Sequence, residues 1–382
     1  MAERKAVIYI ITQLELGGAQ KVCAALAHGM QVHGWHTILI AGPGILQNQL
    51  ALQKVHLLAT LERSVGLGKI TNELRSLRQL IHLLKQYKNE YETIIVHTHS
   101  TKAGILGRWA AWWAGISVRI HTVHGFAFHE HQSRPAWLVI TLIEWMTSWV
   151  TTEFVCVSQR DQKTGSRLLP RFKQHNTLIC AAIAPAYFKQ MLTHQRPTDH
   201  FIIGTISCFK PQKNILDLLK AFQAIYRSHA HTRLEIIGDG AQRPFIEQWI
   251  RTAGLQDVIT LHGWQEYVID HLKRWHLFAL SSLWEGLPCA VVEARRMQLP
   301  VVSYDVGGIS QVIINGRNGI LCTPQDWHAL AHAAKYLMDN PDYYHALASY
   351  QDDLKAFTYE HMCEQHHQLY ERLTTIRAAE LA

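Results

Sequence analysis

Two glutamates stand eight positions apart in the stretch from Ser281 to Ala294. Glu285 falls in a Gly/Pro loop after an apolar, strand-like run, and Glu293 falls inside the helix that Pro288 is expected to start. Backbone N–H groups at about Ala290–Val292 would open this helix and offer an anion site. Apolar neighbours of Glu293 disfavour a solvated surface position. The pattern could hold a phosphate on amides while the two carboxylates bind sugar hydroxyls.

A second candidate phosphate site is Gly17-Gly18-Ala19, which follows the first expected strand directly. Glycines let the backbone approach a ligand closely, and a helix N-terminus offers unpaired N–H groups. An ordinary tight turn between strand and helix is the alternative. The segment Gly238-Asp-Gly240 also follows a strand but lacks the third glycine of a dinucleotide fingerprint, so it is a weak signal for NAD.

Histidine is abundant, with 25 residues in 382, and six of them fall within a short part of the first half. Imidazole is a common zinc ligand, so a metal-dependent hydrolase is one alternative function. The H-E-x-x-H motif is absent, however. The six histidines are His97, His99, His121, His124, His129 and His131.

The elements that must position these residues alternate along the chain. Short β-branched runs, such as Val7–Thr12 and Thr93–His97, are separated by amphipathic segments, such as Gly18–Val32. Each half of the chain shows its own series of alternating strand-like and helix-like segments. This pattern predicts an α/β protein with two doubly wound Rossmann-like domains. Ligands of such sheets bind at the carboxyl ends of the strands.

A polar segment at His194–His200 is the expected linker. The predicted domains are therefore residues 1–195 and 196–356, and a terminal helix at about 357–382 is expected to pack back on the first domain.

Composition excludes several classes of protein. The 48% apolar and 18% charged residues can form two full cores and argue against disorder. No apolar run reaches the ~18–20 residues of a spanning helix, and the N-terminus reads as a first strand rather than a signal peptide. Seven scattered cysteines without C-x-x-C give no disulfide or zinc framework. We therefore expect a cytoplasmic protein, with peripheral contact at the inner face of the cell membrane left open.

Charge is unevenly distributed between the halves. Residues 1–195 carry 20 Lys/Arg and 10 Asp/Glu, whereas residues 196–382 carry 17 and 20. A basic first half is expected to meet an anion, although random surface variation would also give this difference. Nucleic acid is disfavoured because no Arg-rich groove motif accompanies the charge.

The glutamate pair resembles the E-x7-E signature of retaining glycosyltransferases of family 4, which have the GT-B fold of two Rossmann-like domains facing a central cleft. Further motifs follow in the family's order through nearly the whole chain. They are Gly17-Gly18-Ala19, Thr122-Val-His124-Gly-Phe126, Val155-Cys-Val-Ser158, Pro211-Gln-Lys213-Asn, Gly238-Asp-Gly240, Val306-Gly-Gly308 and Asn318-Gly319.

The resemblance implies roles for individual residues. His124 would contact the donor sugar near the reacting centre, and Lys213 would neutralise the leaving diphosphate. Glu285 would hold hydroxyls of the transferred sugar, and Glu293 those of the ribose. Further donor contacts would come from Gly17, Gly18, Gly286, Leu287, Ala290, Val291 and Val292.

One position departs from the family pattern. Members often place an arginine five residues before the lysine, and here that residue is Cys208. A thiol cannot pair with phosphate as a guanidinium does, so Lys210 is the candidate substitute. The residues expected to bind the acceptor are Lys102, His99 and Ser158.

Two helical segments, Lys102–Ala114 and Trp137–Trp149, are rich in tryptophan. They would pack in the core or lie on a membrane interface. If they contact lipid, a polyprenyl-diphosphate-linked acceptor follows, because it is both anionic and membrane-held.

The sequence therefore predicts a retaining transferase of hexose or N-acetylhexosamine. Its donor would be a nucleotide-sugar, expected to be UDP-linked, and its acceptor a glycan or polyprenyl-diphosphate-linked molecule of cell-surface polysaccharide synthesis. No metal or other cofactor is expected. The alternatives are the hydrolase built on the histidine cluster and a non-catalytic nucleotide-binding scaffold.

Overall fold

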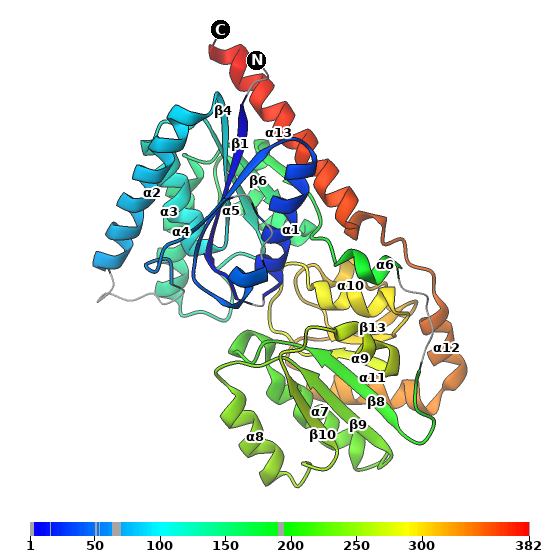
Figure 1. Ribbon diagram of the computed structural model, residues 1–382. Helices are drawn as coiled ribbons and strands as arrows, with labels where there is room; N and C mark the ends of the chain where they lie inside the picture. The colour runs from blue at the N-terminus through cyan, green and yellow to red at the C-terminus, as the bar shows by residue number, and fades with distance from the viewer. Residues whose placement is uncertain are drawn as a thin grey trace. The chain divides into compact units, whose positions relative to one another are not determined.

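The computed structural model of the chain describes residues 4–15, 17–49, 52, 54–62, 70–189 and 195–381. The chain divides into two compact units. Unit 1 comprises Met1–Ala182 and Ala356–Ala382, and unit 2 comprises Ile183–Lys355 (Figure 1). Unit 1 is therefore built from two separate parts of the chain.

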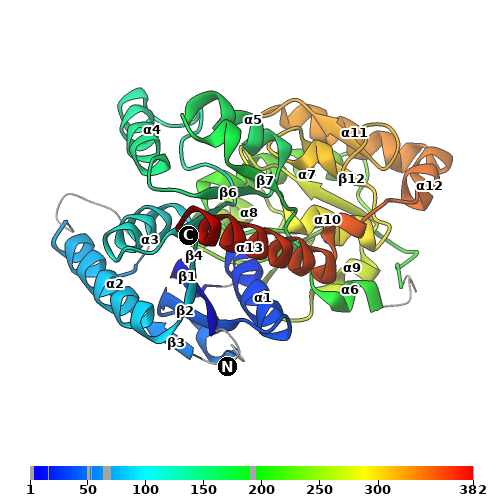
Figure 2. The ribbon, with the colours of Figure 1, turned by 90° about the horizontal axis from the view of Figure 1, so that it is seen from above.

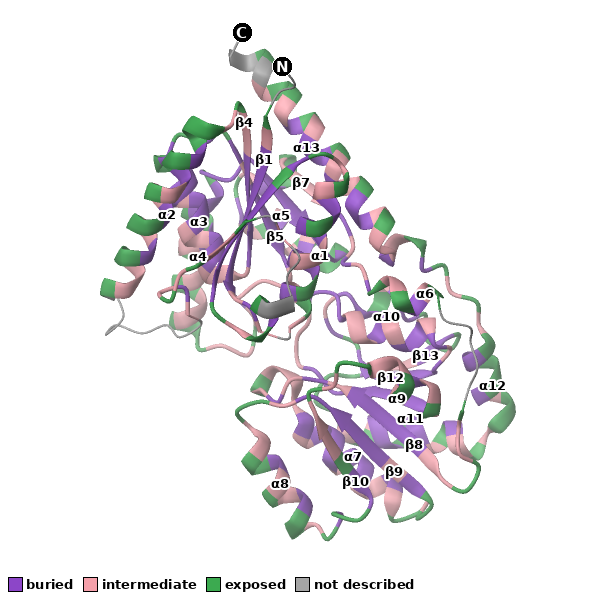
Figure 3. Cartoon of the chain, in the orientation of Figure 1, coloured by how far each residue is buried: buried purple, intermediate pink, exposed green. Residues whose placement is uncertain are grey.

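Unit 1 contains a parallel sheet whose strands, as described, run in the order β3-β2-β1-β4-β5-β6-β7. Strands covered on both faces must be apolar throughout, and Ala6–Ile11 of β1 are completely buried (Figure 3). The order reverses between β1 and β4. The strands are β1 (Lys5–Gln13), β2 (His36–Gly42), β3 (Lys54–Leu57), β4 (Thr93–His99), β5 (Val118–Val123), β6 (Glu153–Cys156) and β7 (Asn176–Leu178).

The helices of unit 1 include the last one in the chain. Helix α13 packs against α1 (Figure 2), and the Tyr370 hydroxyl on α13 shares a 3.2 Å hydrogen bond with the Tyr9 hydroxyl on β1. The helices are α1 (Gly18–Val32), α2 (Ile70–Glu90), α3 (Thr101–Trp113), α4 (Arg134–Ser148), α5 (Gln159–Leu168) and α13 (Tyr359–Leu381).

Unit 2 repeats the topology on a smaller scale. Its described strands are all parallel, in the order β10-β9-β8-β11-β12-β13, and the order reverses between β8 and β11. Strands β8 (Phe201–Ile206), β9 (Thr232–Ile237), β10 (Ile259–Gly263), β11 (Leu277–Leu280), β12 (Val301–Tyr304) and β13 (Gly319–Cys322) form the sheet. The helices are α6 (Pro185–Lys189), α7 (Ile215–Tyr226), α8 (Arg243–Thr252), α9 (Val268–Arg274), α10 (Cys289–Arg296), α11 (Trp327–Asp339) and α12 (Pro341–Ser349).

The division between the units lies at 182/183, earlier than the expected 195/196. Helix α6 packs against α10, and the Arg296 guanidinium donates a 3.3 Å hydrogen bond to the Phe188 carbonyl oxygen. These contacts place α6 in unit 2. In the expected linker, His194 lies outside the described residues, while residues 195–200 are irregular.

Gly204, in the middle of β8, lies directly against the indole ring of Trp275. A Cβ atom at Gly204 would overlap the ring atoms of Trp275, which is completely buried. Because glycine has no side chain, position 204 leaves room for the ring of Trp275, the largest buried side chain of unit 2.

We expect Gly204→Ala to lower the free energy of unfolding by about 2–3 kcal/mol, because the packed strand and the ring cannot both keep their places. Gly18→Ala is the matched control, since its added methyl group meets no atom within 4 Å and the residue is helical. Thermal and urea unfolding of both variants measure the difference. Equal stability of Gly204→Ala and the unaltered chain would contradict this packing.

Candidate active site

The two loops that flank the strand-order reversal of unit 2 are joined by an ion pair. Lys213 follows β8, Glu285 follows β11, and the Lys213 ammonium contacts the Glu285 carboxylate. The two side chains are 15% and 8% exposed. Ligands of doubly wound sheets bind at this reversal, so the pair lies where a ligand is expected.

Main-chain hydrogen bonds hold the same two loops together. The Leu283 N–H donates to the Gln212 carbonyl oxygen at 2.8 Å, and the Gln212 side-chain amide donates to the Trp284 carbonyl oxygen at 2.7 Å. The Ser281 hydroxyl donates to the Asn214 carbonyl oxygen at 2.9 Å. Sequence reasoning missed Gln212 and Ser281, because nothing in their spacing indicates that they join two distant loops.

A third loop supports the backbone of Glu285. Gly307 has a positive φ of 57°, and a Cβ atom at this position would overlap the Glu285 carbonyl oxygen. The Gly308 N–H donates to the Gly286 carbonyl oxygen at 2.6 Å. The Val306-Gly-Gly308 motif therefore fixes the loop that carries Glu285. Gly286 contributes its backbone carbonyl oxygen as the hydrogen-bond acceptor.

Helix α10 begins after Pro288, and its first turn differs in one respect from the expected anion site. The Val291 N–H donates to the Pro288 carbonyl oxygen at 2.9 Å, so this amide is used inside the helix. The Val291 and Val292 side chains are completely buried, Leu287 is buried, and Ala290 is half-buried. The sequence predicted that the N–H groups of Ala290, Val291 and Val292 all point outward. Val291 does not fit this prediction, because its N–H group is hydrogen-bonded within the helix.

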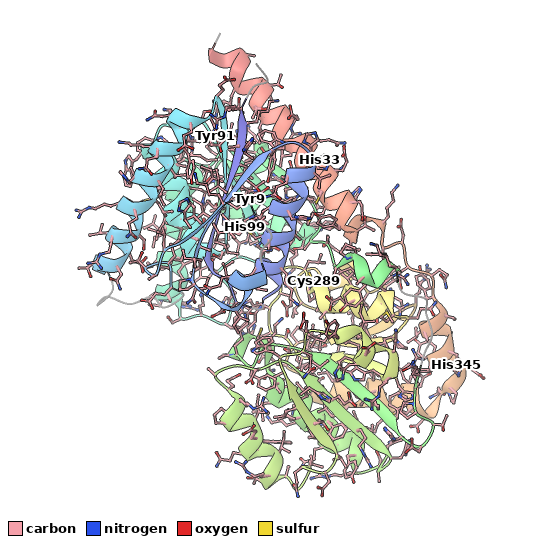
Figure 4. All side chains as sticks on the ribbon, viewed as in Figure 1. Tyr9, His33, Tyr91, His99, Cys289 and His345 are labelled. Atoms are coloured by element: carbon pink, nitrogen blue, oxygen red, sulfur yellow. The ribbon has the colours of Figure 1, made fainter. Side chains whose placement is uncertain are left out.

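Glu293 accepts a hydrogen bond from the hydroxyl of Tyr187 on α6. Burial, followed by the nearby Glu293 charge, raises the pKa of Tyr187, so the hydroxyl stays protonated and remains a donor. Burial also raises the pKa of Cys289, at the start of α10, to about 12 (Figure 4). Tyr187 was missed by sequence reasoning, since its short helix carries no motif.

The loop after β8 also contains the position that departs from the family pattern. Cys208 is a half-buried free thiol, and its carbonyl oxygen accepts a 2.9 Å hydrogen bond from the Lys210 N–H. Lys210 precedes the 3-10 turn Pro211–Lys213 and is half-buried. Its backbone therefore helps to shape the turn that presents Lys213.

In unit 1 the structure brings His99 and His124 together. His99 Nδ1 and His124 Nε2 are 2.9 Å apart, so one ring donates an N–H to the other. His99 is completely buried beside Tyr9 (Figure 4), and its Nε2 atom has no partner among the described residues. Burial lowers the pKa of His124 to about 4. The pair is therefore neutral at pH 7, and the hydrogen bond fixes the orientation of the His124 ring.

The buried histidines His97 and His121 bind hydroxyl groups. His97 Nδ1 is 2.5 Å from the Tyr370 hydroxyl, and His97 Nε2 is 2.7 Å from the Thr122 hydroxyl. His121 Nδ1 lies 2.9 Å from the Thr98 hydroxyl. Within the described ranges, no three His, Cys, Asp or Glu side chains of this histidine-rich segment converge as metal ligands.

Two expected acceptor contacts have structural partners instead. The Lys102 ammonium donates to the Glu62 carbonyl oxygen at 2.8 Å and lies 2.7 Å from the Glu73 carboxylate. Ser158 is completely buried and caps α5, where its hydroxyl accepts the Asp161 N–H at 3.1 Å. His99, the third expected contact, is hydrogen-bonded to His124. All three side chains thus have partners inside unit 1, and their contact with the acceptor stays a prediction.

The turn before α1 matches the expected glycine site more closely. Gly17 is the N-cap of α1, and Gly18 is its first residue. Gly18 is exposed, and a Cβ atom there would meet no atom within 4 Å. The space beside this helix start is therefore open.

Helix α4 has the reverse of the usual arrangement of polar and apolar residues. Its buried residues are polar: Glu144 forms a 2.9 Å ion pair with Arg108, and the Thr147 hydroxyl accepts a 3.1 Å hydrogen bond from the Trp109 indole. Beyond Arg134 and Pro135 at its start, its exposed residues are apolar. They are Leu138, Val139, Leu142, Trp145 and Met146, followed by Trp149 just after the helix, and Trp112 and Trp113 are exposed on the neighbouring α3.

Two family models match most of the chain. Residues 17–164 match a glycosyl transferase 4-like domain, and residues 189–353 match the glycosyl transferases group 1. A galactosyltransferase of Escherichia coli, named UDP-Gal:alpha-D-GlcNAc-diphosphoundecaprenol alpha-1,3-galactosyltransferase, is 31% identical over 292 residues, which cover 74% of each chain. The putative glycosyltransferase EpsD of Bacillus subtilis is 26% identical over 68% of this chain and 71% of its own.

Solved structures agree in fold. A sucrose-phosphate synthase from Thermosynechococcus elongatus superimposes with a TM-score of 0.82 at 20% identity, covering 97% of this chain and 100% of its own. Anabaena HepE, solved with UDP and glucose, gives 0.78 at 18% identity, covering 96% and 99%. The chain belongs to the group 1 glycosyltransferases. It is an enzyme with the GT-B fold, which confirms the family, the fold class and the transferase activity that the sequence predicted.

The buried histidines of unit 1 predict a loss of stability in acid. Burial lowers the pKa of His366 on α13 to about 4, and its Nε2 atom is buried with no partner among the described residues. An unfolded imidazole titrates near pH 6.5, so below that pH the unfolded chain binds more protons than the folded one. His366 alone would lower the free energy of unfolding by about 2 kcal/mol between pH 7 and pH 5.

Denaturant unfolding of the full-length chain at pH 7 and pH 5 measures this effect. His366→Gln should reduce the pH dependence, whereas His345→Gln, on the exposed part of α12, should leave it unchanged. A stability that stays constant from pH 7 to pH 5 would contradict the burial of these imidazoles in neutral form.

Proposed function

We propose that the enzyme transfers a hexose or N-acetylhexosamine from a UDP-linked donor to a glycan or polyprenyl-diphosphate-linked acceptor of cell-surface polysaccharide synthesis. The observation that carries the proposal is the Lys213–Glu285 pair at the strand-order reversal of unit 2. The E. coli relative supports the donor and acceptor classes, because its name contains a UDP-sugar and a diphosphoundecaprenol acceptor.

Unit 2 is proposed to bind the donor through groups that are already in place. A diphosphate beside Lys213 competes with Glu285 for the ammonium group and releases the carboxylate to accept hydrogen bonds from sugar hydroxyls. Tyr187 orients Glu293 for the ribose hydroxyls. Because hydrogen bonds fix both loops before the donor arrives, little ordering is required during the reaction.

We propose that transfer retains the anomeric configuration and needs neither a metal ion nor a protein nucleophile. The bond from the anomeric carbon to the diphosphate oxygen breaks, and the acceptor hydroxyl attacks from the same face. The departing phosphate oxygen takes the acceptor proton. Lys213 stabilises the negative charge that develops on the leaving diphosphate.

Unit 1 is proposed to bind the acceptor. Its sequence range carries the excess of basic residues, which suits an anionic diphosphate. His124 is the proposed contact near the reacting centre, and His99 holds its ring through the 2.9 Å hydrogen bond. A neutral imidazole in this place can donate or accept a hydrogen bond without adding charge.

The exposed face of α4 is proposed to rest on the inner surface of the cell membrane. Six apolar side chains, five on the helix and Trp149 just after it, cover this face, while Glu144, Thr147 and Ser148 are buried, so an apolar environment satisfies the helix better than water. Helix α4 would then lie in the interface plane. Within the described residues, no helix is long and apolar enough to cross a bilayer.

Lys213→Met should weaken UDP binding by about 10- to 100-fold, because a charge-assisted contact to the diphosphate is lost. Binding of UMP, which lacks the second phosphate, should change less. Calorimetry with UDP and UMP measures both. Lys335→Met on α11 is the matched control and should bind UDP like the unaltered enzyme.

Glu285→Gln should lower kcat/KM for sugar transfer by about 10²–10³-fold while UDP still binds. Transfer from a panel of UDP-sugars to a synthetic polyprenyl-diphosphate sugar measures the rate. Glu360→Gln, which removes an exposed carboxylate on α13, is the control. NMR of the product reports the anomeric configuration, and an inverted product would exclude the proposed mechanism.

The double variant Trp145→Ser/Trp149→Ser should bind vesicles of mixed phosphatidylglycerol and phosphatidylethanolamine at least several-fold more weakly. Two large exposed apolar side chains of α4 are then lost from the interface. Vesicle co-sedimentation measures binding. Val32→Ser removes an exposed apolar side chain from α1 and should have no effect. Equal binding by the double variant would refute the membrane contact of α4.

A further inference from the structure

Three side chains of unit 2 converge outside the loops that carry Lys213 and Glu285. They are Glu235 on β9, His262 on β10 and His271 on α9. One ligand atom of each lies within 4.8 Å of the others, and the described residues contain no further group of this kind. Strands β9 and β10 pair at the edge of the sheet (Figure 1).

The register of the sheet and one turn of helix explain this convergence. Glu235 pairs with Thr260 across β9 and β10, and His262, two residues further along β10, lies at an irregularity of the register between Leu261 and Gly263. His271 and Trp275 are four residues apart, and both approach the same carboxylate oxygen. Trp275 is fixed in turn by the space at Gly204.

The distances at Glu235 fit a bound ion. Its Oε2 atom lies 3.2 Å from His262 Nε2 and 3.4 Å from His271 Nδ1, both long for hydrogen bonds to a carboxylate. Zinc bonds of 2.0–2.1 Å in tetrahedral geometry would separate neighbouring ligand atoms by about 3.3–3.4 Å. The two separations from the carboxylate oxygen to the imidazole nitrogens therefore already match two edges of a tetrahedral site.

The surroundings also suit a metal. The Trp275 indole donates a 2.9 Å hydrogen bond to Glu235 Oε2, a contact that would orient the carboxylate as a ligand. His262 and His271 are 21% and 17% exposed, so an ion and a water ligand have access.

We propose that Glu235, His262 and His271 form a binding site for a divalent transition-metal ion of the zinc type, with water as the fourth ligand. The ion would link the edge strand β10 to β9 and α9. The site is independent of the proposed transfer reaction, which uses no metal. Arg274 opposes the ion, since its guanidinium lies 3.7 Å from Glu235 Oε1 and carries the same sign of charge.

The test is a titration of the metal-free full-length chain with Zn²⁺ alone, followed by calorimetry and by competition with a chromophoric chelator. We expect one tight site per chain and a higher midpoint of thermal unfolding with zinc. His262→Gln/His271→Gln should lose this site, while the glutamine amides can still donate to Glu235. His229→Gln, which removes a surface histidine paired with Asp339, should keep it.

Two further measurements separate this site from adventitious binding to other histidines or to cysteines. Arg274→Gln should tighten zinc binding by about 3- to 10-fold, because a nearby positive charge is removed. Co²⁺ should give the visible spectrum of a tetrahedral ion without a sulfur-to-cobalt band. No stoichiometric zinc binding, or binding that persists in the double glutamine variant, would overturn the proposal.

Discussion

The site in unit 2 depends on one constraint: an ammonium group and a carboxylate are held together where the strand order reverses. Parallel strands β8 and β11 bring Lys213 and Glu285, 72 positions apart in the chain, to the same edge of the sheet. Burying either charge alone would be costly, so each keeps the other in place. In the proposed reaction, the donor diphosphate would bind Lys213 and the sugar would bind Glu285, so the one contact between these side chains would be replaced by two contacts to the donor.

The sequence predicted the architecture well, because the apolar and amphipathic patterns that indicate strands and helices are local in the chain. Buried parallel strands must be continuously apolar, and α1 was predicted with the bounds it has in the structure. Other elements carry little such signal. Strands β3 and β7 are short and lie at the two edges of their sheet, and α5, Gln159–Leu168, is almost wholly polar. A motif, by contrast, located Glu285 and Lys213 without any knowledge of the sheet.

What the sequence could not supply was the partner of each polar side chain. Lys102 and Ser158 were suitable in type and position for an acceptor site, yet an ion pair and a helix cap use them. Tyr187 and Gln212 have no motif, and their contacts to distant residues exist only in the folded chain. Hydrogen bonds of this kind depend on tertiary distances of a few ångströms, which spacing along a chain does not encode.

The division of unit 1 into two parts has a consequence for synthesis of the chain. Unit 2 is inserted between residues 182 and 356, so a ribosome completes all of it before the residues of α13 emerge. Until then, Tyr9 and His97 lack the Tyr370 hydroxyl, and one side of α1 lacks its cover. Domains usually fold as units in order of emergence. In this chain, synthesis of unit 1 begins first, but unit 2 is complete before unit 1. Unit 1 therefore lacks α13 while unit 2 folds.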